Sequence, residues 1–88
     1  MSTDKRFLET LQLKIDDEVT LLDLDERIEK IVDNEEIPTA LECYGSDEIL
    51  NWGEYPYYFV EDGYPVCKIN FEVIENIGDE NSIIKILE

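Results

Sequence analysis

The sequence predicts a single α+β domain covering residues 1–88, in which an antiparallel sheet of about five strands packs with two helices. Three observations support this fold class. The last quarter of the chain has the pattern of a β-hairpin, and residues 24–32 have helical spacing of apolar residues. A chain of 88 residues is also too short for a second hydrophobic core.

The predicted hairpin begins after Pro65. Cys67, Ile69, Phe71 and Val73 alternate with polar residues, which is typical of a half-buried strand. Residues 76–81 contain the Asn, Gly and Asp that turns favour. The final segment, 82–87, is apolar on both faces, so we expect it to be covered at least in part on both sides.

Two helices are expected in the first half of the chain. One of Ser2, Thr3 and Asp4 would cap a short helix, after which alternation from Leu11 to Ile15 predicts a strand. A second cap lies in residues 23–26, residues 33–36 end the second helix, and Pro38 prevents its continuation. The apolar stripe of this second helix is formed by Leu24, Ile28, Ile31 and Val32.

The segments after the second helix are expected to be mainly extended. Residues 39–44 and 57–60 are predicted strands, and residues 49–55 are predicted to form a loop or a broken strand. Glu61-Asp62-Gly63 predicts a turn between the strand at 57–60 and the hairpin.

Charge is the strongest compositional signal. Asp and Glu number 23 against seven Lys and Arg, which gives a net charge of −16. Binding to nucleic acid or to an anionic membrane is disfavoured because the electrostatic contribution has the wrong sign. The sequence therefore favours a basic protein partner. The alternative is that the acidic surface only improves solubility.

The residues required for most enzyme chemistry are absent. There is no histidine, and the four glycines occur singly rather than in a phosphate-binding loop. Asp16-Asp17-Glu18 lacks the spacing of a calcium loop. The chain is therefore not expected to be an enzyme, and no cofactor and no metal site are predicted.

Cellular context is predicted from the cysteines and the start of the sequence. Cys43 and Cys67 both fall in predicted strands and are interpreted as small buried residues rather than a disulfide. The first residues lack the apolar segment of a signal peptide, and no run approaches the length of a membrane span. We therefore expect a cytoplasmic protein, located in the host cell if it is phage-encoded.

The remaining functional feature of the sequence is its set of closely spaced, exposed carboxylates. Duplex DNA carries one negative charge per ~1.7 Å of axis, and closely spaced exposed carboxylates can imitate part of that pattern. A solvated helix face is the simpler interpretation of such residues. The aromatic residues Trp52, Tyr55, Tyr57 and Tyr58 are either interface anchors or core residues. The candidate partner-binding carboxylates are Asp16, Asp17, Glu18, Glu26 and Glu29.

Several stretches resemble the family of phage uracil-DNA glycosylase inhibitors, which are small acidic DNA mimics. Residues 73–76, 78, 80–81 and 84–87 resemble that family's C-terminal hairpin. Residues 13–18 resemble the strand leading to its acidic edge. The second-helix resemblance lies in Leu24, Glu26, Ile28, Glu29, Ile31, Val32 and Asn34.

The resemblance implies an inhibitor that occupies the DNA-binding groove of uracil-DNA glycosylase. It assigns Asp17 and Glu18 to the acidic edge. Arg27 and Lys30 stand where the family's second helix carries further acidic residues. Two alternatives remain: an inhibitor or immunity protein for another basic nuclease, including a CRISPR effector, and a non-inhibitory acidic regulatory subunit. The pocket that receives an apolar side chain of the target would be lined by Ile28, Ile31 and Val32.

The net charge predicts how stability responds to salt. With a net charge of −16, the carboxylates of this small domain repel one another. Salt screens this repulsion, with a Debye length of about 10 Å at 0.1 M. Adding NaCl between low and moderate concentration should therefore raise the Tm measured by circular dichroism. A flat or falling Tm would mean that the charges are already compensated internally.

Overall fold

The computed structural model describes residues 3, 5–32, 38–58 and 65–88. The expected α+β fold with an antiparallel sheet is confirmed, although the described residues form four strands and four helices rather than about five and two. The elements in chain order are α1 (Lys5–Thr10), β1 (Glu18–Thr20), α2 (Leu21–Val32), α3 (Ala40–Tyr44), α4 (Ser46–Trp52), β2 (Glu54–Tyr58), β3 (Pro65–Glu75) and β4 (Ile83–Leu87).

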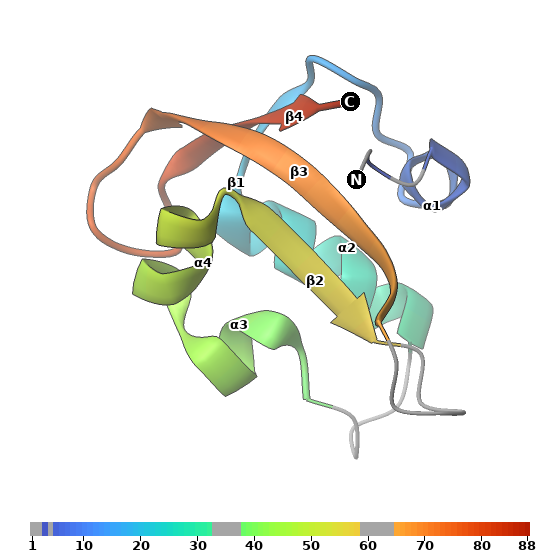
Figure 1. The fold of residues 1–88 in the computed structure, drawn as a ribbon, viewed down its shortest axis with the longest axis horizontal. Coiled ribbons are helices and arrows are strands. Elements are labelled where there is room, and N and C mark those ends of the chain that lie inside the picture. Colours follow the sequence, from blue (N-terminus) through green and yellow to red (C-terminus); the bar gives the residue numbers. More distant parts are fainter. Residues whose placement is uncertain (1–2, 4, 33–37, 59–64) are drawn as a thin grey trace.

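The sheet has the strand order β1-β4-β3-β2, and every neighbouring pair is antiparallel (Figure 1). The expected hairpin is confirmed as β3 and β4, with Phe71 opposite Ile86 and Val73 opposite Ile84. In its turn Gly78 takes a positive φ of 85°, and its N–H donates to the Asn76 side chain at 2.8 Å. Of the alternating set, Ile69 and Phe71 lie in the core and Val73 packs against it, so these side chains share one face of β3.

That face forms the hydrophobic core together with the helices. Leu21, Leu24 and Ile28 of α2 are 0–1% exposed, as are Ile84 and Ile86 of β4. Leu8 and Leu11 close the core at the α1 end, and the partial cover expected on both faces of the last strand is present. No helix formed by the described residues is long and apolar enough to cross a membrane. The other buried apolar residues are Leu13, Ala40, Ile49, Leu50, Tyr55, Ile69 and Phe71.

Helix α2 begins earlier than its sequence pattern predicted. The Thr20 hydroxyl accepts a hydrogen bond from the Asp23 backbone N–H at 3.0 Å, so Thr20 caps the helix. The predicted cap at residues 23–26 lies inside the helix instead. Residues 19–22 thus complete β1 and turn directly into α2.

The strand expected at residues 11–15 is wrong, although the alternation that suggested it is real. Leu11 and Leu13 are buried and Gln12 and Lys14 are exposed, yet Gln12 has a φ of 62° and Asp16 a φ of 75°. These left-handed residues fold the backbone into turns that follow α1. Thr3 also differs from expectation, because its buried hydroxyl bridges the Asn70 N–H and the Leu87 carbonyl rather than capping α1.

The strand expected at residues 39–44 is also wrong, because these residues form α3. Thr39 caps this helix, since its hydroxyl accepts from the Glu42 N–H at 3.3 Å. The loop or broken strand expected at residues 49–55 is wrong for residues 49–52, which belong to α4. Gly53 is the left-handed C-cap of this helix with a φ of 70°, and residues 54–55 begin β2. β2 overlaps the strand expected at 57–60 in residues 57–58, while residues 59–60 and the turn expected at 61–63 lie outside the described residues.

A buried polar pair joins α2 to β2. The Tyr55 hydroxyl donates a hydrogen bond to the Asp25 carboxylate, and the two residues are 1% and 5% exposed. Burial raises the pKa of Tyr55 far above its usual value, and the hydrogen bond and charge of Asp25 raise it further. The backbone of Leu41 and the side chain of Thr39 oppose this effect. Helices α2 and α3 and strand β2 therefore meet at one phenol group.

Replacing Tyr55 with Phe should destabilise the fold by about 1–3 kcal/mol, because Asp25 then stays buried without its donor. The raised pKa adds a pH dependence. Above about pH 10 the unfolded chain ionises Tyr55 while the folded chain does not, so wild-type stability falls as pH rises. Urea unfolding should thus show the wild-type advantage over Y55F narrowing above that pH. A gap that stays constant or widens would contradict the burial of the phenol.

Candidate functional site

Asp17 and Glu18, expected at the acidic edge, and the neighbouring candidate Asp16 lie just before and at the start of β1, but they are not equally available. The Asp17 side chain accepts a hydrogen bond from the Lys14 N–H at 2.9 Å and so stabilises a turn. Asp16 lies 3.8 Å from the Lys85 ammonium, and Glu18 is the cross-strand neighbour of Lys85. Glu18 and Asp16 are exposed, and Asp17 is half-buried. This edge is therefore acidic but partly neutralised by Lys85.

The structure brings Glu26 and Glu29 together on the exposed face of α2. They are three residues apart, which makes them neighbours on a helix surface, and both are exposed. Lys30 is exposed beside them. Arg27 turns away: its guanidinium donates to Asp23 at 3.1 Å and to the Leu11 carbonyl at 2.8 Å. Of the two basic residues on this helix, Arg27 is thus directed towards α1 rather than towards a partner.

The apolar residues expected to line a pocket are separated by the fold. Ile28 is 1% exposed and belongs to the core, so it presents no surface to a partner in this structure. Ile31 is 40% exposed. The Val32 side chain lies outside the described residues. The partner-binding prediction for this stripe therefore rests on Ile31.

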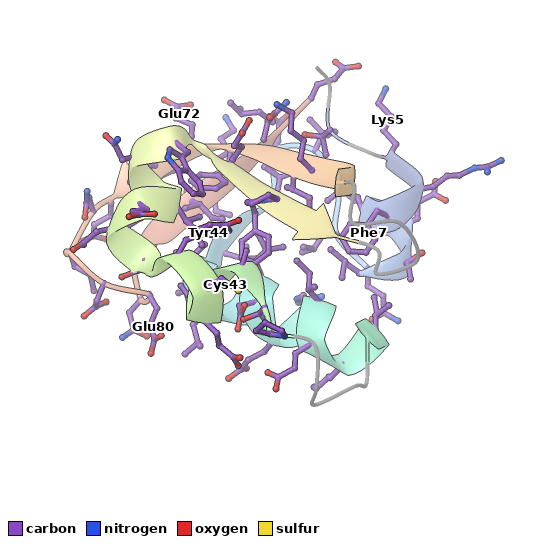
Figure 2. The ribbon with its side chains drawn as sticks, turned by 60° about the horizontal axis from the view of Figure 1, so that its bottom comes forward. Lys5, Phe7, Cys43, Tyr44, Glu72 and Glu80 are labelled. Atoms are coloured by element: carbon purple, nitrogen blue, oxygen red, sulfur yellow. The ribbon has the colours of Figure 1, made fainter. Side chains whose placement is uncertain are left out.

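The basic residues are unevenly distributed. No Lys or Arg stands between Lys30 and Lys68, nor between Lys68 and Lys85. Lys68 itself pairs with Glu54 at 2.6 Å on the open face of the sheet. In both views α1 lies at the opposite end of the molecule from α4 and the β3–β4 turn, as Lys5 and Glu80 show in Figure 2. The described acidic residues within these two cation-free stretches are Glu42, Asp47, Glu48, Glu54, Glu72, Glu75, Asp79 and Glu80.

An exposed aromatic pair lies on α3 and α4. The rings of Tyr44 and Trp52 pack edge to face with centroids 5.1 Å apart, and the side chains are 39% and 44% exposed. The sequence identified Trp52 as a possible anchor, but it placed Tyr44 in a strand. Only the helical backbone of both segments brings the two rings together.

Cys43 precedes this pair on α3 and is exposed with a free thiol. The expected burial of Cys43 in a strand is therefore wrong, and the Cys67 side chain lies outside the described residues. Within the described ranges, no three His, Cys, Asp or Glu side chains come together as a set of metal ligands. The chemistry that the described surface offers is thus carboxylate charge and exposed aromatic area.

Comparisons of the chain with models of protein families, with curated proteins and with solved structures find no match.

Two substitutions on α2 test the division between core and surface. Ile28→Ala should cost about 2–5 kcal/mol in free energy of unfolding, because it leaves a cavity in the core. Ile31→Ala should change stability by no more than about 0.5 kcal/mol, because the side chain is largely exposed. Equal losses in urea unfolding would show that α2 is rotated relative to this description.

Proposed function

We propose that this protein is a DNA mimic, which inhibits a basic DNA-binding enzyme by occupying its DNA-binding groove. The observation that carries the proposal is a folded, well-buried core beneath a surface of net charge −16. The electrostatic field of this negative surface attracts a positively charged groove and speeds association with it. A rigid scaffold also fixes the positions of the carboxylates, which a disordered acidic chain does not.

Uracil-DNA glycosylase is the first target to test. The sequence resemblance to inhibitors of that enzyme suggests it, and the direction of Arg27 removes one objection. A basic groove would repel an outward-pointing Arg27, but this side chain is held by Asp23 and by the Leu11 carbonyl. Glu26 and Glu29 remain exposed on the helix surface.

Another basic nuclease is the second candidate, and the position of Ile28 favours it. The resemblance to the inhibitor family assigned Ile28 to a pocket for an apolar side chain of the glycosylase. With Ile28 in the core, only Ile31 of that stripe is accessible among the described side chains. A target recognised chiefly through its basic groove does not require the pocket.

Inhibition of uracil excision tests the first target. Stoichiometric protein should abolish excision by uracil-DNA glycosylase, and the inhibition should weaken as salt rises, because opposite charges drive the encounter. Full glycosylase activity in excess protein would rule that target out. The DNA-mimic proposal would then be tested by binding to basic nucleases. Binding that duplex DNA displaces would support the proposal, and binding that is unaffected by duplex DNA would contradict it.

Neutralising Glu26 and Glu29 tests the proposed contact surface. The variant E26Q/E29Q should associate with the target about two- to tenfold more slowly, with a smaller change in dissociation, because exposed charges act mainly on the encounter. The matched control is E9Q/E88Q, which removes the same charge from exposed residues at the α1 end of the molecule, where Glu88 pairs with Lys5 at 2.9 Å. Equal slowing in both variants, measured by stopped flow, would show that net charge alone governs association.

A further inference from the structure

The aromatic pair defines a second surface, separate from the carboxylates of β1 and α2. We name it the α3–α4 surface, and it consists of Glu42, Tyr44, Asp47, Glu48 and Trp52. Both rings are more than a third exposed, and all three carboxylate residues are exposed. Tyr and Trp are among the residue types that contribute most of the binding energy at protein interfaces, and here both are open to solvent on a small domain.

The scaffold beneath this surface holds the rings in place. Ile49 and Leu50 bury the inner side of α4, with exposures of 0% and 7%. The Gly53 carbonyl accepts a hydrogen bond from the Phe71 N–H at 3.0 Å, which ties the end of α4 to β3. Gly45 alone separates α3 from α4. The indole therefore projects from a short, anchored helix rather than from a loop, so little conformational freedom is lost when it is covered.

Carboxylates lie next to the indole. Glu48 and Trp52 are four residues apart on α4, a spacing that places their Cβ atoms about 5–6 Å apart on one helix face. Asp47 adjoins Glu48 in the first turn of the helix, and Glu42 lies on α3. The pairing of Gly53 with Phe71 also brings the following residue, Glu72, towards the Trp52 end of α4.

The elements that carry this surface have charge of one sign, although Lys68 of β3 pairs with Glu54 of β2 at 2.6 Å and Lys85 lies opposite Glu72. The chain has no Lys or Arg from residue 31 to residue 67, so α3, α4 and β2 carry no basic side chain. The β1 and α2 carboxylates differ in this respect, because Lys85, Arg27 and Lys30 lie among them. A cation placed on the indole thus meets attraction from the ring and from its neighbours, with no competing cation on these elements.

We infer that the α3–α4 surface binds an arginine-bearing basic segment of a partner protein. A guanidinium is planar, stacks on aromatic faces and pairs with two carboxylate oxygens at once, which matches the indole and Glu48 better than an ammonium does. Nucleic acid is disfavoured by the charge of −16, and a second copy of the chain would bring like charges together. The inference goes beyond DNA mimicry, since the partner segment need not belong to a DNA-binding enzyme.

Trp52 is the only tryptophan of the chain, so its fluorescence reports on the surface directly. The probe is a short peptide of alternating Arg and Gly, compared with a Lys–Gly peptide of the same length and charge. Titration with the Arg peptide should shift the emission of Trp52 saturably. The Arg peptide should bind about three- to tenfold more tightly than the Lys peptide, because arginine stacks on the ring.

Variants separate recognition by this surface from attraction by net charge. Trp52→Leu keeps an apolar side chain but removes the π face, so calorimetry should show the Arg peptide losing about three- to thirtyfold in affinity. D47N/E48Q should weaken binding more than its matched control E26Q/E29Q, which removes equal charge from α2. Circular dichroism melts of each variant verify that the fold is retained, as the exposure of these side chains leads us to expect.

Three results would overturn the inference. Equal losses in the two double variants would mean that the peptide follows net charge only. Equal affinity for the Arg and Lys peptides would remove the role of guanidinium stacking. An unchanged Trp52 emission at saturating peptide would place the binding elsewhere. Inhibition of a DNA-binding enzyme that persists in W52L leaves the DNA-mimic proposal standing while excluding this surface from it.

Discussion

The buried pair of Asp25 and Tyr55 determines how α2 lies against the sheet. Neither group tolerates burial without a hydrogen-bond partner, so the helix must present Asp25 to β2 at the same time as it buries Leu21, Leu24 and Ile28. These requirements fix the rotation of α2 about its axis. The side chains on the far side of the helix, Glu26 and Glu29, therefore face solvent in a set orientation.

The same pair draws α3 into the structure. Thr39 caps α3. Hydrogen bonding by the Thr39 side chain and by the Leu41 backbone lowers the pKa of the Tyr55 phenol, against the larger effect of burial. The position of α3, and through Gly45 that of α4, thus depends on a polar contact in the core rather than on apolar packing alone. Two acidic surfaces result, and they differ in kind. The surface of β1 and α2 mixes carboxylates with Lys85, Arg27 and Lys30, whereas that of α3 and α4 combines carboxylates with aromatic rings.

The β3–β4 hairpin and the existence of α2 could be predicted from the sequence because their signals are local. Alternation from Ile69 to Val73, with turn residues after it, requires no knowledge of the rest of the chain. Residues 11–15 show where local reasoning fails. Their burial alternates as in a strand, but Gln12 and Asp16 adopt left-handed conformations, which are uncommon for any residue other than glycine and are not predicted by the alternation.

The candidate surfaces likewise contain some features that local sequence predicts and others that depend on the whole fold. Exposure of Glu18, Glu26 and Glu29 follows from their charge and could be anticipated. The burial of Ile28 and the exposure of Ile31 could not, because both belong to one apolar stripe at helical spacing and only the packing of the rest of the chain decides which part of the stripe is covered. The pairing of Tyr44 with Trp52 depends on helices at residues 40–52, where a cap and a core phenol override the extended pattern of the sequence.

The edges of the sheet have a consequence for self-association. The strand order leaves β1 and β2 as its outer strands. β1 has only three residues and follows the left-handed Asp16, and β2 contains Pro56, which has no N–H to donate. Neither strand offers a long, regular row of backbone donors on which another chain could extend the sheet. Within the described residues, both edges of the sheet therefore disfavour the addition of a strand from another chain, which is the contact that builds fibrils.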